Sequence, residues 1–207
     1  MKLILSILTA LVACTAASPV HPLTVVSSRR LGRKPCPKGG TLPLNYIAPT
    51  LMVPVSANLP DIAFGSTKTP LITPNNFCTI FNLVIPPSAP GDTCTLEFLF
   101  PDYEETSSPY MYHGGGHFTF TGYAFGSGAT EETTYNHQPP PGPSPPQPPA
   151  VMSPGNAYIV NVGGCGAEPP GSLGVSGMLC SPDTVFSYLQ TEGDELGCPI
   201  GFFVAIS

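Results

Sequence analysis

Tryptophan is absent from this chain of 207 residues, and charged residues make up only 10% of it. The indole ring is a favoured platform for sugar rings, so its absence weakens a carbohydrate-binding role, although tyrosine can replace it. No Asn-x-Ser/Thr sequence occurs, and N-linked glycans are therefore not expected. No apolar run reaches the roughly 20 residues that a membrane-spanning helix needs.

Basic residues are scarce after the first 38 positions, where Lys68 is the only base against all 13 acids of the chain. Nucleic acid and anionic membranes are poor partners for such an acidic body. The other bases past Lys2 gather early: Arg29, Arg30, Arg33, Lys34 and Lys38. With 28 prolines and 22 glycines, the chain also leaves little room for helices.

The first 17 residues have the pattern of a secretory signal peptide. Lys2 supplies a positive charge, a short apolar run follows, and Thr15, Ala16 and Ala17 form a small-residue cleavage region. Residues 18–38 are then either a basic pro-segment, cut after Arg29-Arg30, or an unprocessed flexible arm. We expect a secreted protein of the extracellular space or cell wall, free of the membrane once the leader is removed.

Six cysteines remain after the predicted cleavage: Cys36, Cys78, Cys94, Cys165, Cys180 and Cys198. An even set in an oxidising compartment predicts three disulfides. We expect Cys180 to pair with Cys198 and Cys94 with Cys165. No Cys-x-x-Cys pair is present, so zinc is not expected.

Two apolar segments give the fold class. Residues 93–100 alternate between buried-type and polar side chains, which is the period of a half-buried strand, and residues 77–85 are apolar on both faces. We expect them to pair as antiparallel neighbours, with Val84 opposite Cys94 and Ile80 opposite Phe98. Short strands are predicted at 42–47, 51–56, 61–65, 69–73, 77–85, 93–100, 117–124, 130–135, 157–162, 172–179, 184–190 and 200–206. The pattern predicts an all-β, antiparallel β-sandwich over 39–207, a single domain stapled by disulfides. Residues 138–149, which are rich in proline, should form an exposed loop that cannot pair as a strand.

Four blocks carry a family resemblance: CTIFNLVIPPSAPGDTCTLEFLFPD, ATEETTYN, SPGNAYIVNVGGCGAE and FSYLQTEGDELGCPIGFFVAI. In this order and spacing, over Phe77 to Ile206, the chain resembles the fungal family named for the C-terminal domain of the ubiquitin-3-binding protein. The resemblance implies a compact β-rich domain, often behind a signal peptide, with no established enzymatic residues. The cytosolic role in the family name conflicts with the leader. The proline-rich insert and the cysteines at 180 and 198 depart from the family pattern.

Candidate sites for chemistry are few. The acidic loop after residue 100 is our candidate ligand site, with Asp102, Tyr103, Glu104, Glu105, Tyr110 and Tyr112 as its members. Its carboxylates suit calcium or glycoside hydrolysis, although a solvated loop is the simpler interpretation. His113 and His117 are separated by three glycines and are interpreted as solvated. Glu131 and Glu132 are interpreted as charges on an exposed strand edge. Gly174 to Met178 falls short of the Gly-x-Ser-x-Gly motif, so no catalytic residue, metal or cofactor is assigned.

The sequence therefore predicts a secreted, non-enzymatic β-sandwich, structural or ligand-binding, whose partner is a wall glycan or an extracellular protein. Two alternatives remain. One is a carboxylate-dependent enzyme acting on wall polysaccharide, and the other is a secreted effector that binds a host protein.

The leader makes a testable prediction. Sequencing the amino terminus of protein recovered from the medium should give a start near Ser18, or near Leu31 if Arg29-Arg30 is cut. Recovery of a chain that still begins at Met1 would contradict the secretory interpretation.

Overall fold

The computed structural model describes residues 34–87, 91–142, 149–166, 171–193 and 197–207. These residues belong to one compact unit. The predicted signal peptide and most of the predicted basic arm lie outside them, as does the middle of the proline-rich loop, 143–148. No helix in this part of the chain is long and apolar enough to cross a membrane.

The described residues form eleven strands in three antiparallel sheets and contain no helix, which confirms the all-β prediction. The strands are β1 (Tyr46–Ile47), β2 (Leu51–Ser56), β3 (Leu71–Ile72), β4 (Phe77–Ile85), β5 (Thr93–Phe100), β6 (Tyr110–His113), β7 (Thr119–Gly122), β8 (Asn156–Gly164), β9 (Leu173–Cys180), β10 (Val185–Tyr188) and β11 (Gly201–Ile206).

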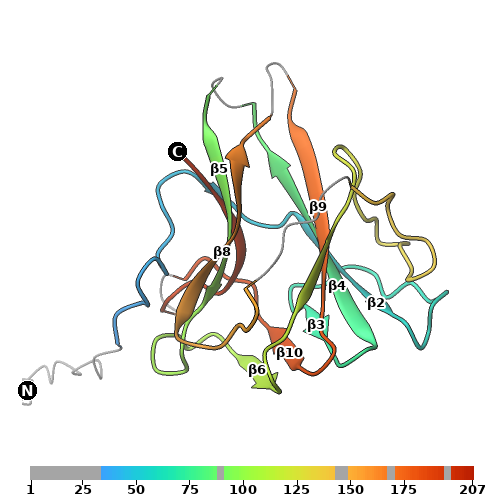
Figure 1. Ribbon diagram of the computed structural model, residues 1–207, viewed down its shortest axis with the longest axis horizontal. Helices are drawn as coiled ribbons and strands as arrows, with labels where there is room; N and C mark the ends of the chain where they lie inside the picture. The colour runs from blue at the N-terminus through green and yellow to red at the C-terminus, as the bar shows by residue number, and fades with distance from the viewer. Residues whose placement is uncertain (1–33, 88–90, 143–148, 167–170, 194–196) are drawn as a thin grey trace, which may run out of the picture. The chain divides into compact units, whose positions relative to one another are not determined.

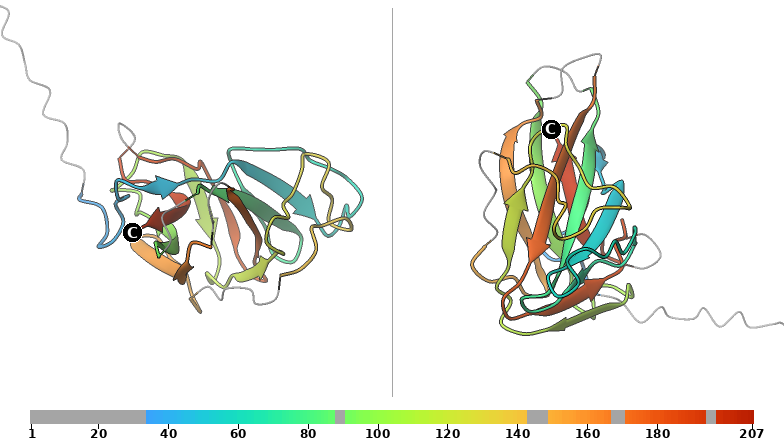
Figure 2. Two further views of the ribbon diagram at one scale, coloured as in Figure 1. Left: turned by 90° about the horizontal axis from the view of Figure 1, so that it is seen from above. Right: turned by 90° about the vertical axis from the view of Figure 1, so that its right-hand side faces the viewer.

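Two four-stranded sheets make the sandwich. Their strand orders are β1-β11-β5-β8 and β2-β4-β9-β7, and a smaller sheet, β3-β10-β6, lies at one end of them. Figure 1 shows the smaller sheet at the bottom, and Figure 2 shows the same strands from above and from the side. The ring centroids of Phe81 on β4 and Phe202 on β11 are 4.8 Å apart, so the two large sheets contact each other directly near this end.

An aromatic cluster fills the interior where the three sheets meet. Phe98 on β5 has its ring centroid 4.8 Å from that of Phe202, 5.5 Å from that of Tyr188 and 5.9 Å from that of Phe186. Most of these pairs are edge-to-face, the arrangement that the ring quadrupole favours, and each stabilises by about 0.5–1.5 kcal/mol beyond the area it buries. The rings thereby join β5, β10 and β11 into one core.

Parts of the outer faces of both large sheets are also buried. Leu99 and Phe203 point away from the aromatic cluster and are still fully buried, with Tyr46 packed edge-on against Phe203. On the other sheet, Asn82 accepts a hydrogen bond from the amide of Ala129 and donates one to its carbonyl. This pair of bonds fixes the 124–131 segment against β4.

Several predicted strands need correction. Residues 61–65 and 130–135 are not strands, so Glu131 and Glu132 lie in an exposed turn and not at a strand edge. In that turn the amide of Thr130 donates to the hydroxyl of Thr133, and such local bonds compete with strand pairing. Strand β6 was missed, because its four residues alternate weakly between a proline and three glycines.

The predicted pairing of β4 with β5 is wrong. Strand β4 pairs with β2 and β9, whereas β5 pairs with β11 and β8. Leu83 of β4 and Leu96 of β5 contribute to the same hydrophobic cluster, so the strands face each other across the sandwich. The alternation identified the buried faces correctly, but it does not say whether those faces meet edge to edge or across the core.

Residues 140–142, near the start of the proline-rich loop, form hydrogen bonds with the last residue of β7 and with the chain just after it. The carbonyl of Pro140 accepts from Ala124, and the amide of Gly142 donates to Gly122. Pro141 itself needs no donor here, because its neighbours make both bonds. These three residues thus make an isolated bridge, and no strand forms among the described residues of the predicted loop.

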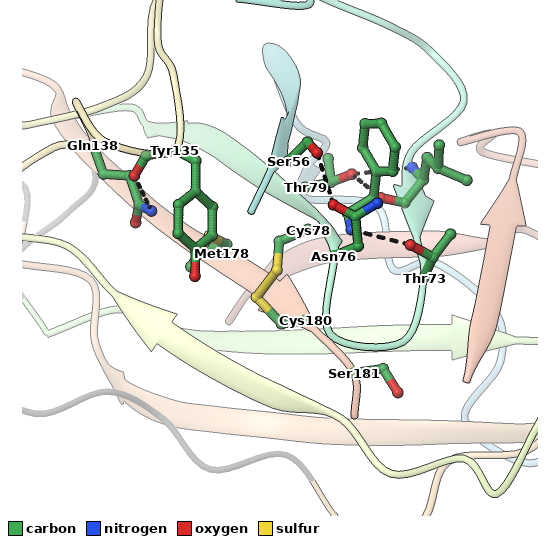
Figure 3. The surroundings of a disulfide bond; sticks show 12 residues. Ser56, Thr73, Asn76, Cys78, Thr79, Tyr135, Gln138, Met178, Cys180 and Ser181 are labelled. Carbon is green, nitrogen blue, oxygen red and sulfur yellow. Dashed lines mark hydrogen bonds between the residues drawn. A yellow bond between two sulfur atoms is a disulfide. The ribbon is translucent and has the colours of Figure 1, made fainter. Parts of the chain in front are cut away.

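Three disulfides are present: Cys36–Cys198, Cys78–Cys180 and Cys94–Cys165. The predicted Cys94–Cys165 bridge is confirmed, and the predicted Cys180–Cys198 bridge is wrong. Cys180 instead bonds to Cys78 on the neighbouring strand β4. Both cysteines pack in a hydrophobic cluster with Met178, and the polar side chains of Asn76 and Ser56 lie near the bridge (Figure 3). The first bridge attaches the N-terminal segment to the chain just before β11.

The bridges make a second prediction. They close loops of 162, 102 and 71 residues, and replacing the pair Cys36 and Cys198 by serine should lower the free energy of unfolding by about 2–5 kcal/mol. Urea unfolding measures the loss, and peptide mapping without reduction should recover the three pairs. Recovery of a peptide that joins Cys180 to Cys198 would contradict the assignment.

Candidate functional site

The acidic loop is a tight turn that leaves the end of β5. The carbonyl of Asp102 accepts hydrogen bonds from the amides of Glu105 and Thr106, at 2.9 and 3.2 Å. The carboxylate of Glu105 returns to the amide of Asp102 at 2.6 Å, and the carboxylate of Asp102 accepts from the amide of Tyr103, also at 2.6 Å. Two of the three predicted carboxylates therefore hold the backbone of the turn.

Glu104, the third carboxylate, forms an ion pair with Lys34 of the N-terminal segment. Its hydrogen bond and negative charge raise the pKa of Lys34 above the ordinary value. Both side chains are largely exposed, and exposed pairs of this kind contribute little to stability.

The tyrosines form a stacked platform beside the turn. Tyr103 lies flat on Tyr110, with centroids 4.0 Å apart and planes 13° apart. Tyr110 and Tyr112, two residues apart on β6, both pack edge-on against Phe100. The ring of Tyr103 remains 59% exposed, whereas burial raises the pKa of Tyr110 above its ordinary value. We call Asp102–Glu105 with Tyr110 the tyrosine turn.

Tyr112 faces a different neighbour from the rest of the predicted set. Its hydroxyl donates to the carbonyl of Met152 at 2.7 Å. The structure thus brings five of the six predicted residues together at the tyrosine turn, and Tyr112 serves to attach β6 to the 149–155 segment.

His113 and His117, the two histidines on either side of the three glycines, do not converge on a common site. His113 is exposed, and Nδ1 of His117 lies 2.6 Å from the carboxylate of Asp183. A hydrogen bond from the hydroxyl of Thr184 and the contact with His117 lower the pKa of Asp183. The described residues include no group of three or more histidine, cysteine or acidic side chains placed to hold a metal.

Close packing explains why glycines occur between these histidines. A Cβ at Gly114 would lie 2.3 Å from the carbonyl oxygen of Asp183, and one at Gly116 would lie 2.5 Å from that of Met152. Both glycines also adopt positive φ. The amide of Gly116 donates to Thr184 at 2.8 Å, so this loop is fixed tightly to the 181–184 turn.

The incomplete Gly-x-Ser-x-Gly motif lies within β9 and has no strand-to-helix turn. Ser176 donates its hydroxyl hydrogen to Asn82 at 2.9 Å. Its role is to position the Asn82 amide, which in turn binds the 124–131 segment.

A cleft that the sequence did not predict opens between the two large sheets, away from the smaller sheet. Its volume is about 610 Å³. The walls come from β4, β5, β9 and β11 and the rim from β7 and β8. No acidic or basic side chain and no histidine occurs among its described lining residues, most of which are aliphatic, aromatic or glycine. Glycines in β8 leave the space open. Because glycine has no side chain, the hydrophobic pattern of the sequence does not reveal such a cleft.

Glu97 is the one acidic side chain on the strands of the sandwich in the described residues, and it lies outside the cleft on the opposite face of β5. It sits between Phe203 on β11 and Ile159 on β8. Its Oε1 atom is buried and makes no hydrogen bond to a described residue. Burial raises its pKa from 4.5 to about 7.

Helix-free sheets packed face to face define the class of this protein as a β-sandwich. Within that class, the chain belongs to the family of the ubiquitin 3 binding protein But2 C-terminal domain, whose pattern matches residues 47–194. This confirms the family resemblance that the four sequence blocks predicted. No curated protein and no solved structure is detectably similar to the chain.

Glu97 makes a third prediction. Because burial raises the pKa of Glu97, folding favours the protonated carboxyl. The contribution of Glu97 to the free energy of unfolding is therefore full below pH 4.5 and is lost as the pH rises through about 7. Glu97→Gln stays neutral and should be more stable than the wild type above that pH, by about 1–2 kcal/mol for a half-exposed group. Below 4.5 the two should be alike. Urea unfolding across this range measures the difference.

The control is Glu132→Gln, the same change in an exposed turn, which should follow the wild type at every pH. If the Glu97→Gln and wild-type curves stay parallel, the carboxyl is not desolvated in the fold.

Proposed function

We propose that this protein is a secreted, non-enzymatic binding domain of the extracellular space or fungal cell wall. Three disulfides support secretion, since such bridges persist in oxidising compartments and are rare in the cytosol. The leader pattern of residues 1–17 supports the same compartment. The domain acts by binding a partner and releasing it unchanged.

The exposed face of Tyr103 carries the proposal for the binding surface. The ring is held rigid by its stack on Tyr110, which in turn packs against Phe100, so little side-chain entropy is lost when a partner covers it. Exposed tyrosines of this kind dominate the binding energy of many protein interfaces. Three carboxylates against the one paired Lys34 leave the turn with a net negative charge, which favours a partner with basic groups.

A protein is the favoured partner, and a wall glycan is the second candidate. The family name describes binding to a protein, which supports the first choice. A flat tyrosine platform also suits stacking of a sugar ring, which supports the second. The carboxylates of Asp102 and Glu105 accept hydrogen bonds from the turn, and this arrangement favours a structural role over acid–base chemistry on polysaccharide.

The fourth prediction tests this surface. Secreted protein, immobilised and exposed to extracellular proteins and wall glycans, should retain a partner. Tyr103→Ala should weaken that binding at least tenfold, because loss of a central aromatic contact costs about 2 kcal/mol or more. Folding should be unchanged, since the ring is exposed.

Phe64→Ala is the matched control, because Phe64 is another exposed ring that packs on one aromatic neighbour, Phe77. It should bind as the wild type does. Equal binding by the Tyr103→Ala variant would place the surface elsewhere, and release of soluble sugars from wall glycans would contradict the non-enzymatic proposal.

A further inference from the structure

The cleft between the large sheets has the size of a ligand site. At about 610 Å³ it lies well within the range of about 300–1,000 Å³ over which pockets enclose small molecules. It exists because the two halves of the interior are filled differently. Phenylalanine and tyrosine rings fill the half next to the smaller sheet, whereas the other half holds a smaller aliphatic cluster with Leu83, Leu96 and Val204, beside which the cleft opens.

The chemistry of the lining restricts what the cleft can take. None of its described lining residues carries a charge near neutral pH, and burial raises the pKa of Tyr123, which keeps that phenol neutral. A charged ligand would lose its hydration without gaining a counter-charge, which is strongly unfavourable. The hydroxyl of Tyr123 already donates to Gln138, and that of Ser176 donates to Asn82.

Asn161 is the polar group that remains. Its side chain makes no hydrogen bond to any residue that the structure describes. It is exposed and lies at the rim of the cleft, where a β-bulge interrupts the pairing of β8 with β5: Leu96 lies opposite Asn161, Glu97 lies opposite Ile159, and Val160 is left over. Bulges often redirect a side chain next to a binding site. Without the bulge, strict alternation would turn Asn161 outward.

We propose that the cleft binds a neutral, largely aliphatic small molecule that carries one uncharged polar group, such as a long-chain alcohol. The aliphatic part lies among Leu83, Leu96 and Val204, and the hydroxyl exchanges hydrogen bonds with the Asn161 amide. This site is separate from the tyrosine turn, which lies beyond the other end of β5, so each proposal can fail without the other.

Gly163 allows a sharp test. It lies opposite Cys94 on the inward face of β8 and lines the cleft, and a Cβ there would meet nothing within 4 Å. Its φ is outside the left-handed region, so a larger side chain adds no backbone strain. Gly163→Leu should therefore fill the cleft while the fold stays at least as stable as the wild type.

The experiment uses secreted full-length protein, with Nile red fluorescence to report binding and 1-dodecanol, dodecane and dodecanoate as competitors. We expect the wild type to bind Nile red and to release it to 1-dodecanol more readily than to dodecanoate at neutral pH. Gly163→Leu should weaken Nile red binding at least tenfold, with an unchanged or raised melting temperature.

Asn161→Val should weaken the binding of 1-dodecanol about tenfold, which is the usual contribution of one hydrogen bond, and should leave the binding of dodecane unchanged. Val162→Leu, an apolar enlargement on the outer face of the same strand, is the matched control and should change nothing.

Three results would overturn the proposal. They are failure of the wild type to bind Nile red or 1-dodecanol, unchanged binding by Gly163→Leu, and dodecanoate binding as tight as that of the alcohol. The first would leave the cleft to a side chain of a partner protein, and the last would show that charge is tolerated.

Discussion

The packing of aromatic rings around Phe98 is the interaction on which the rest of this structure depends. Phe98 contacts rings from β10 and β11 and its own strand neighbour Phe100, so one side chain connects the large sheet of β5 to the smaller sheet. Phe81 extends the contact to the opposite sheet. With few charges and no helices, the chain has no other core of comparable size in the residues described.

Strand β5 links this core to both candidate sites. Its second half carries the rings and leads directly into the tyrosine turn, so Tyr103 and Tyr110 rest on the best-packed part of the molecule. Its first half carries Cys94 and Leu96, which line the cleft. The second half of β5 thus supports the exposed Tyr103 ring, and its first half borders the cleft, so one strand serves both candidate sites.

Strand positions could be predicted from the sequence where alternation or apolar runs were strong, and β4 and β5 have the expected bounds. Partners could not be predicted, because alternation identifies a buried face and not what covers it; the pairing of Cys180 with Cys198 failed for the same reason. The residues of the tyrosine turn were identified from composition. The cleft could not be predicted, because Gly163 leaves space where another residue would place a side chain. The bulge in β8 arises from its pairing with β5, which the sequence pattern does not reveal.

A crystal structure of the secreted protein under xenon pressure would test most directly whether rings close one end of the interior and leave the other open. Xenon enters apolar cavities large enough to hold it and is excluded from close-packed regions. The account predicts xenon between Leu83, Leu96 and Val204 and none around Phe98. Absence of xenon from the cleft, with the two sheets close-packed along its whole lining, would contradict it.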